Sequence, residues 1–317
     1  MGKYMNPLLD FSFKRLFGQD ANKELLIDFL NILFEGERKV EDITFMDKEI
    51  PSEFLEGRMV IFDILCREKD GTFFIVEMQN SNQFYFFDRA LFYLCRMISS
   101  QGQKGSGWNF KICPVYGIYF LNFRLPGLEK LRTDVILADR DTGIQTDKRL
   151  RQIFISLPHF NLEADECKTD FERWIYLFKN MDTLERIPFE TKKATFKKLL
   201  KAAEVESLNS GDRWLYDKIL KNYRDYVNTV EYAKVEGERR GIKIGREKGI
   251  AEGKMKGIEI GREKGIAEGK MKGIEIGREK GRKEEKRLLA IQLKKEGLPF
   301  DFISRLTGLP PEEIKLL

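Results

Sequence analysis

A β-hairpin is the feature that most restricts how this chain can fold. Residues 59–79 read MVIFDILCREKDGTFFIVEMQ, two apolar stretches joined by Lys69-Asp70-Gly71. Three-residue hairpin loops need a positive φ at one position, which the glycine of this loop supplies at no steric cost. The loop therefore predicts two antiparallel strands in a fixed register, with Glu68 opposite Thr72.

This register brings two carboxylates together. Asp63 is then directly opposite Glu77, and facing residues have Cβ atoms about 4.5–5.5 Å apart. Period-two alternation also places Glu77 and Gln79 at the end of an otherwise apolar row. Two carboxylates this close repel each other unless a cation lies between them. The hairpin thus indicates a site for a hard divalent ion such as Mg²⁺ or Mn²⁺, or a solvated strand end compensated by Arg67 or Arg89.

The segments around the hairpin predict an α/β domain. Apolar spacing over 8–34 indicates two amphipathic helices that are split near Gly18. Strands are expected over 42–46, 59–67, 72–79, 112–123, 134–139 and 152–157, with a helix over 83–100. The resulting order is αβββαβ.

In these features the sequence resembles the PD-(D/E)XK nuclease superfamily, specifically its group of recombination-promoting nucleases and transposases. The resemblance covers nearly the whole chain, including the helical stretch after Asp165, the glycine-spaced repeat and the tail. The matching motifs are Asp10-Phe11-Ser12-Phe13-Lys14 with Leu16-Phe17, then Asp63, then Glu77-Met78-Gln79, and finally Arg89 with Tyr93.

The resemblance implies a restriction-endonuclease-like core with a mixed sheet. It also implies that Asp63 and Glu77 hold Mg²⁺, for which Mn²⁺ could substitute, with the Met78 backbone carbonyl as a third ligand. Gln79 occupies the place usually held by lysine. Its amide offers neutral hydrogen bonds where an ammonium would stabilise the charge that develops on the phosphate.

Three further side chains are candidate catalytic residues, those of Lys14, Asp10 and Arg89. Lys14 could supply the missing positive charge, or it could be a surface residue that pairs with Asp10 one helical turn earlier. Arg89 could contact phosphate, or it could form an ion pair with Asp88 or with neighbours of Glu77.

A glycine repeat follows this part of the chain. The sixteen residues GREKGIAEGKMKGIEI from Gly245 recur identically from Gly261, and twelve glycines from Gly237 to Gly281 fall on every fourth position. Each interior glycine costs a helix about 0.5–1 kcal/mol relative to alanine. Close helix pairing and a mobile linker both remain open, as does direct binding of nucleic acid, because residues 237–287 carry 17 Lys or Arg against 10 Asp or Glu.

Four regions are therefore expected. Residues 1–160 form the nuclease-like core and 161–236 a helical subdomain. Residues 237–287 form the basic repeat, through which we expect the chain to form a homo-oligomer. Residues 288–317 form a small tail resembling a helix-turn-helix, which could contact DNA or pack against a partner.

Composition excludes several other classes of protein. His159 is the only histidine, so catalysis by several imidazoles is impossible, and the four cysteines show no Cys-x-x-Cys pair that would indicate a zinc site. No run approaches the roughly 18 apolar residues that span a bilayer, and the N-terminus lacks the apolar core of a secretory signal. We therefore expect a cytoplasmic protein without a membrane partner.

These features together predict a Mg²⁺-dependent deoxyribonuclease that hydrolyses phosphodiester bonds in double-stranded DNA. Little sequence specificity is expected, and the resemblance implies a link to DNA recombination or mobile elements. Two alternatives remain at this stage. One is a catalytically weak module for DNA binding or assembly, and the other is a transposase that also performs strand transfer.

Overall fold

The computed structural model describes residues 2–50, 59–81, 85–105, 107–189 and 193–317. The chain divides into two compact units, Met1–Asn228 and Thr229–Leu317, which we call the core unit and the repeat unit. In the described part of the chain, no helix combines the length and apolar character needed to cross a membrane. The division into four functional regions remains a prediction.

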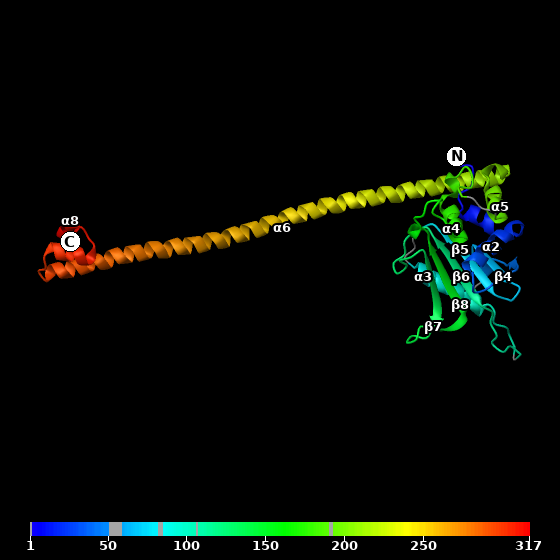
Figure 1. Cartoon of the computed structure of the whole chain (residues 1–317), viewed down its shortest axis with the longest axis horizontal. Coiled ribbons are helices and arrows are strands. Elements are labelled where there is room, and N and C mark those ends of the chain that lie inside the picture. Colours follow the sequence, from blue (N-terminus) through cyan, green and yellow to red (C-terminus); the bar gives the residue numbers. More distant parts are fainter. Residues whose placement is uncertain (1, 51–58, 82–84, 106, 190–192) are drawn as a thin grey trace. The chain divides into compact units, whose positions relative to one another are not determined.

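A mixed six-stranded sheet forms the centre of the core unit (Figure 1). Its strand order is β1-β4-β5-β6-β8-β7, in which β5, β6 and β8 run parallel and the other neighbours are antiparallel. A separate two-stranded ladder pairs β2 with β3. The strands are β1 (Ile43–Phe45), β2 (Glu49–Ile50), β3 (Val60–Ile61), β4 (Ile64–Glu68), β5 (Phe73–Gln79), β6 (Val115–Leu121), β7 (Arg132–Ala138) and β8 (Gln145–Ser156). The predicted α/β class with a mixed sheet is confirmed.

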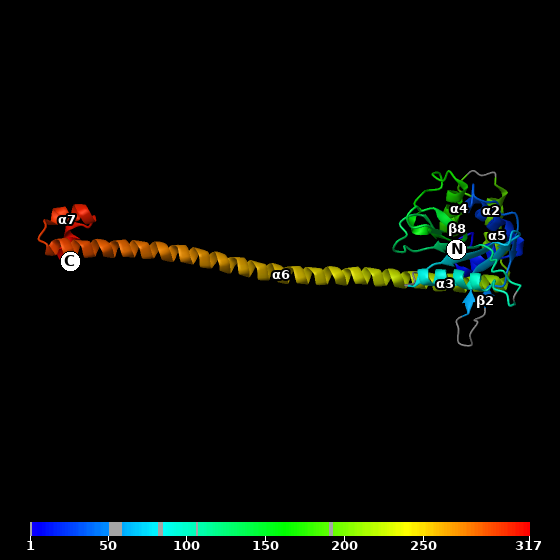
Figure 2. The ribbon, with the colours of Figure 1, turned by 90° about the horizontal axis from the view of Figure 1, so that it is seen from below.

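Helices cover both faces of this sheet, with α2, α4 and α5 on one side and α3 on the other (Figure 2). The helices of the first side are α1 (Asp10–Phe17), α2 (Lys23–Leu33), α4 (Asp170–Asn180) and α5 (Ala194–Ala203), and the helix of the second side is α3 (Phe86–Ser99). Short 3₁₀ turns occur at Asp20–Asn22, Leu157–His159, Met181–Thr183 and Val205–Ser207. The predicted split of the first helical stretch near Gly18 is confirmed.

An aromatic cluster joins the first layer of helices to the sheet. Phe178 on α4 lies 5.1 Å from Phe17 on α1 and 4.5 Å from Phe120 on β6, measured between ring centroids. Thr169 caps the start of α4 because its hydroxyl accepts the Glu172 N–H while the Glu172 carboxylate accepts the Thr169 N–H. Helices α4 and α5 thus share one hydrophobic core with α1 and α2, the helices that precede the sheet.

Alternation along β5 assigns its side chains to the two layers. Phe74, Val76 and Met78 pack with the first layer of helices. Phe73 and Ile75 pack under Leu94 and Met97 of α3. The next residue on this second face is Glu77, so the polar end of an apolar row lies on the α3 side of the sheet.

The β4–β5 hairpin has the predicted register. Ile64 faces Val76 and Arg67 faces Phe73, while the Glu68 N–H donates to the Thr72 carbonyl at 2.9 Å. Gly71 has a φ of 95°, which is the conformation that the loop requires.

The preceding strand differs from the expectation of one extended segment over 59–67. Instead β3 and β4 are separate strands, with a bend at Phe62 and Asp63 between them. The bend arises because β3 pairs with β2, whereas β4 pairs with β1 and β5. The chain therefore turns from one ladder into another at the first candidate carboxylate.

The repeat unit consists of helix. The glycine repeat lies in α6 (Ser210–Lys295), which is followed by α7 (Phe300–Thr307) and α8 (Pro311–Leu316). Ala290 of α6 packs with Ile303, Leu309 and Ile314. Residues 288–317, expected to form a small tail, contain the end of α6 followed by α7 and α8, and we call this segment the three-helix tail. Among the described residues, no neighbouring atom lies within 4 Å of a Cβ added at any of the twelve repeat glycines, and self-association through them remains a prediction.

Candidate functional site

Asp63 and Glu77 meet where the β3–β4 bend faces the end of β5. The Asp63 backbone N–H donates to Glu77 Oε1 at 3.1 Å. In the other direction, the Met78 backbone N–H donates to Asp63 Oδ2 at 3.0 Å. The bend makes this exchange possible because it frees the Asp63 N–H from the sheet ladder. The structure therefore brings together the two carboxylates that the hairpin register places opposite each other.

The environment of this pair disfavours ionisation of both carboxyl groups. Glu77 is only 4% exposed, and its burial, followed by the charge of Asp63, raises its pKa to about 8. Burial likewise raises the pKa of Asp63, against the opposing effects of the Met78 N–H and Lys14. Two negative charges in this buried and partly buried pair would repel each other, and an added cation would relieve that repulsion.

Gln79 touches the same pair. Its Nε2 donates to Glu77 Oε2 at 3.1 Å, so both oxygens of Glu77 accept a hydrogen bond, one of them from Asp63. Gln79 is the last residue of β5 and is partly exposed. It acts in this arrangement as a neutral donor that orients the Glu77 carboxyl group.

Lys14 and Asp10 complete one side of the site. The Lys14 ammonium lies 2.6 Å from Asp10 Oδ1 and 3.2 Å from Asp63 Oδ1. Burial lowers the pKa of this lysine, but its bonds to Asp10 and Asp63 outweigh that effect and the pKa is raised. Lys14 thus pairs with Asp10 on its own helix and also contacts Asp63, and a catalytic role for its charge remains a prediction.

Arg89 approaches from α3. Its guanidinium lies 5.4 Å from the ring centroid of Phe86 and 5.8 Å from that of Tyr93. Its positive charge acts against the rise in the pKa of Glu77. A contact between Arg89 and phosphate remains a prediction.

Lys48 is a neighbour of the site that no sequence motif singles out. It is partly buried and immediately precedes β2. Burial and the ammonium of Lys14 lower the pKa of Lys48, while Asp10 and Asp63 act in the opposite direction. No sequence pattern indicated Lys48, because its place beside the site depends on the pairing of the short strands β2 and β3.

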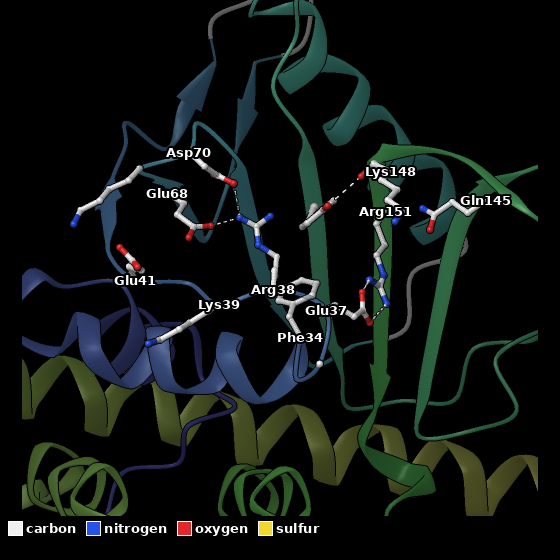
Figure 3. A pocket seen from close by; sticks show the side chains of 13 residues that line it. Phe34, Glu37, Arg38, Lys39, Glu41, Glu68, Asp70, Gln145, Lys148 and Arg151 are labelled. Atoms are coloured by element: carbon white, nitrogen blue, oxygen red, sulfur yellow. Dashed lines mark hydrogen bonds and ion pairs between the residues drawn. The ribbon is translucent and has the colours of Figure 1, made fainter.

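A hollow of about 770 Å³ lies elsewhere on the core unit, by the β4–β5 loop (Figure 3). Two arginines that line it are held by carboxylates. Arg38 forms ion pairs with Glu68 and with Asp70, the latter at 2.8 Å, and Arg151 donates to Glu37 Oε1 at 3.1 Å. None of the candidate site residues lines this hollow. These ion pairs link the segment that follows α2 to β4, to the β4–β5 loop and to β8. The hollow forms no part of the candidate site.

Comparison with known proteins assigns the family. Among curated proteins and solved structures, no match to this chain was found. The family model described as PD-(D/E)XK nuclease family transposase matches residues 7–233, which include the carboxylate pair and all the core helices named above. The chain therefore belongs to the PD-(D/E)XK nuclease family transposases.

Proposed function

We propose that this chain is a Mg²⁺-dependent endonuclease that cleaves double-stranded DNA with little sequence specificity in recombination or in the movement of mobile elements. The observation that carries the proposal is the meeting of the partly buried Asp63 with the buried Glu77, each carboxylate accepting a backbone N–H from the opposite side of the hairpin, in a member of a nuclease family. Removing carboxylates from water lowers the stability of the fold, and a bound metal ion that takes part in hydrolysis would offset that cost.

The residues present suit a hard divalent ion. Carboxylate and carbonyl oxygens are the ligands that Mg²⁺ prefers, and this ion usually binds through one or two carboxylates while keeping several waters. Asp63 and Glu77 would hold it, with the Met78 carbonyl as a third ligand. In the described part of the chain no cluster of three or more Asp, Glu, His or Cys is present, so water and the DNA phosphate would complete the coordination. The bound ion would supply activation of water for attack on the phosphodiester.

The chain's own side chains orient this site. The Lys14 ammonium holds Asp63 from the side of α1, and the Gln79 amide holds Glu77 from the end of β5. The packing of α3 over the sheet excludes water from one side of Glu77. Arg89, on this helix, adds positive charge near the place where phosphate would enter.

Plasmid cleavage tests the proposal. Purified protein with Mg²⁺ is expected to nick supercoiled DNA, and the Asp63→Ala, Glu77→Ala double variant is expected to lose this activity. Asp141→Ala removes an exposed carboxylate on the β7–β8 loop and serves as the matched control. Equal nicking by the wild type and the double variant, or undiminished nicking in EDTA, would refute metal-dependent hydrolysis at this site.

Two features favour a second candidate function, a catalytically weak module for DNA binding or assembly. Gln79 provides no charge where a catalytic lysine is usual, and each oxygen of the two carboxylates already has a partner in the protein. Calorimetry separates the two functions, because a binding module would bind DNA in a salt-dependent manner without binding Mg²⁺ or Mn²⁺. A strand-joining transposase would instead yield strand-transfer products in the cleavage assay.

A further inference from the structure

The polar side chains that touch the carboxylate pair offer little positive charge to a phosphate. Gln79 is neutral, and the Lys14 ammonium is already shared between Asp10 and Asp63. A phosphodiester under attack gains negative charge on its oxygens, and a preorganised positive group stabilises that charge most effectively in a site of low dielectric constant. A second cation close to the pair would meet this need.

Lys48 is fixed beside the pair by its backbone. Its carbonyl accepts the Phe62 N–H at 2.9 Å, which continues the β2–β3 ladder in which Glu49 faces Ile61. Asp63 is the residue that follows Phe62. The hydrogen bond to Phe62 thus holds the Lys48 backbone next to the bend that brings Asp63 to Glu77.

The surroundings of the Lys48 side chain differ from those of Lys14. Lys48 is partly buried, and the charges that act on it are those of Lys14, Asp10 and Asp63. Within the described part of the chain it forms no ion pair, whereas Lys14 forms two. A half-buried ammonium without a carboxylate partner lacks compensation for its lost hydration, and an incoming phosphate would provide that compensation.

We propose that Lys48 is a catalytic residue that contacts the scissile phosphate and supplies the positive charge that Gln79 does not. The inference rests on the proposed nuclease function and adds to it. In the reaction, the oxygen of a water bonds to phosphorus and the bond from phosphorus to one ester oxygen breaks. That oxygen leaves with one proton, and the second proton of the water passes to solvent. Lys48 contributes charge and undergoes no net chemical change.

Single-turnover cleavage of plasmid DNA by the full chain in Mg²⁺ tests this role. Lys48→Gln is expected to slow the cleavage rate by about 100-fold, the magnitude typical of losing one group that stabilises transition-state charge. The affinity for DNA should fall much less, because many other basic residues remain. Lys48→Arg, which keeps the charge, should retain more activity than Lys48→Gln. The matched control is Lys39→Gln, which removes an exposed lysine near the hollow of Figure 3.

A rescue experiment excludes a merely structural role. Gln79→Lys placed in the Lys48→Gln background should restore at least part of the lost rate, because it returns an ammonium next to Glu77, which Gln79 contacts. Inactive wild-type protein would refute the nuclease proposal and with it the role of Lys48. Active wild type with an equally active Lys48→Gln variant would overturn only the role of Lys48. If circular dichroism shows that Lys48→Gln does not fold, the Lys48→Arg variant decides. A cleavage rate of Lys48→Arg as low as that of the Asp63→Ala, Glu77→Ala variant would then contradict the proposal that Lys48 acts through its charge.

Discussion

Replacement of Glu77 by glutamine should stabilise the metal-free protein while it abolishes DNA cleavage. Glutamine has almost the same shape as glutamate, so the β5 packing is preserved, but it carries no charge beside Asp63. Its amide can also keep the local hydrogen bonds. Its oxygen accepts the Asp63 N–H, and its NH₂ group can donate to Gln79 once the side-chain amide of Gln79 rotates.

The magnitude can be worked out from the pKa of Glu77. Folding raises it from an ordinary value of 4.5 to about 8, and at about 1.4 kcal/mol per pH unit this difference sets an upper limit of about 5 kcal/mol. Imperfect hydrogen bonds to the new amide cost about 1–3 kcal/mol. The expected net gain in the free energy of unfolding is therefore about 2–4 kcal/mol at pH 9.

The pH dependence has a definite sign. Because the folded-state pKa of Glu77 is the higher one, between pH 4.5 and 8 the folded protein holds a proton that the unfolded chain has released. The free energy of unfolding of the wild type thus falls as pH rises through this window. The advantage of Glu77→Gln should be absent at pH 4 and should reach its full size above pH 8.

Urea unfolding in EDTA, followed by circular dichroism at several pH values, measures this difference. Asp63→Asn is the matched control, because it removes the other charge of the pair and should also weaken the pH dependence. Saturating Mg²⁺ should stabilise the wild type at pH 8 and leave Glu77→Gln almost unchanged. A Glu77→Gln variant that is less stable than the wild type at pH 9 would show that the pair is not in electrostatic conflict.

Two further substitutions test the frame around the site by urea unfolding. Gly71→Ala should lower the free energy of unfolding by about 1–3 kcal/mol, because φ is 95° and the new Cβ would lie 2.9 Å from Cys113 Sγ. The control is Gly127→Ala, where φ is 87° but no atom of the described residues lies within 4 Å of the new Cβ, so it measures the backbone contribution alone. An equal cost for both variants would disprove the clash with Cys113. Phe178→Ala should cost about 3–5 kcal/mol, since the ring is 2% exposed in the aromatic cluster. Phe302→Ala, at a 46% exposed position, should cost far less, and similar losses for both would contradict the packing argument.

The meeting of the two carboxylates could be predicted because it depends on local geometry. The loop ending in Gly71 fixes the hairpin register, which the β4–β5 ladder keeps as far as Ile64 and Val76, and this register predicts Asp63 opposite Glu77. The layer assignment of β5 was equally accessible, since alternation along one strand decides which side chains share a face.

Features that depend on distant pairing could not be predicted in this way. The bend at Asp63 and the position of Lys48 arise because two short strands, β2 and β3, form their own ladder. The hydrophobic pattern of the sequence does not predict this ladder. The strand expected over 152–157 is the buried end of β8, which begins at Gln145. Its first half is polar and exposed, and it is extended only because it pairs with β7.

The duplicated unit in α6 gives the repeat unit a length that changes in fixed steps. At about 1.5 Å and about 100° per residue, one sixteen-residue copy advances the helix by about 24 Å and rotates its later turns by about 160°. Loss or gain of a copy would therefore displace the three-helix tail along and around the helix axis. Such a change would remove no buried residue, because every residue from 245 to 276 is exposed. The number of copies therefore sets the distance between the start of the repeat unit and the three-helix tail, while both ends of that unit stay the same.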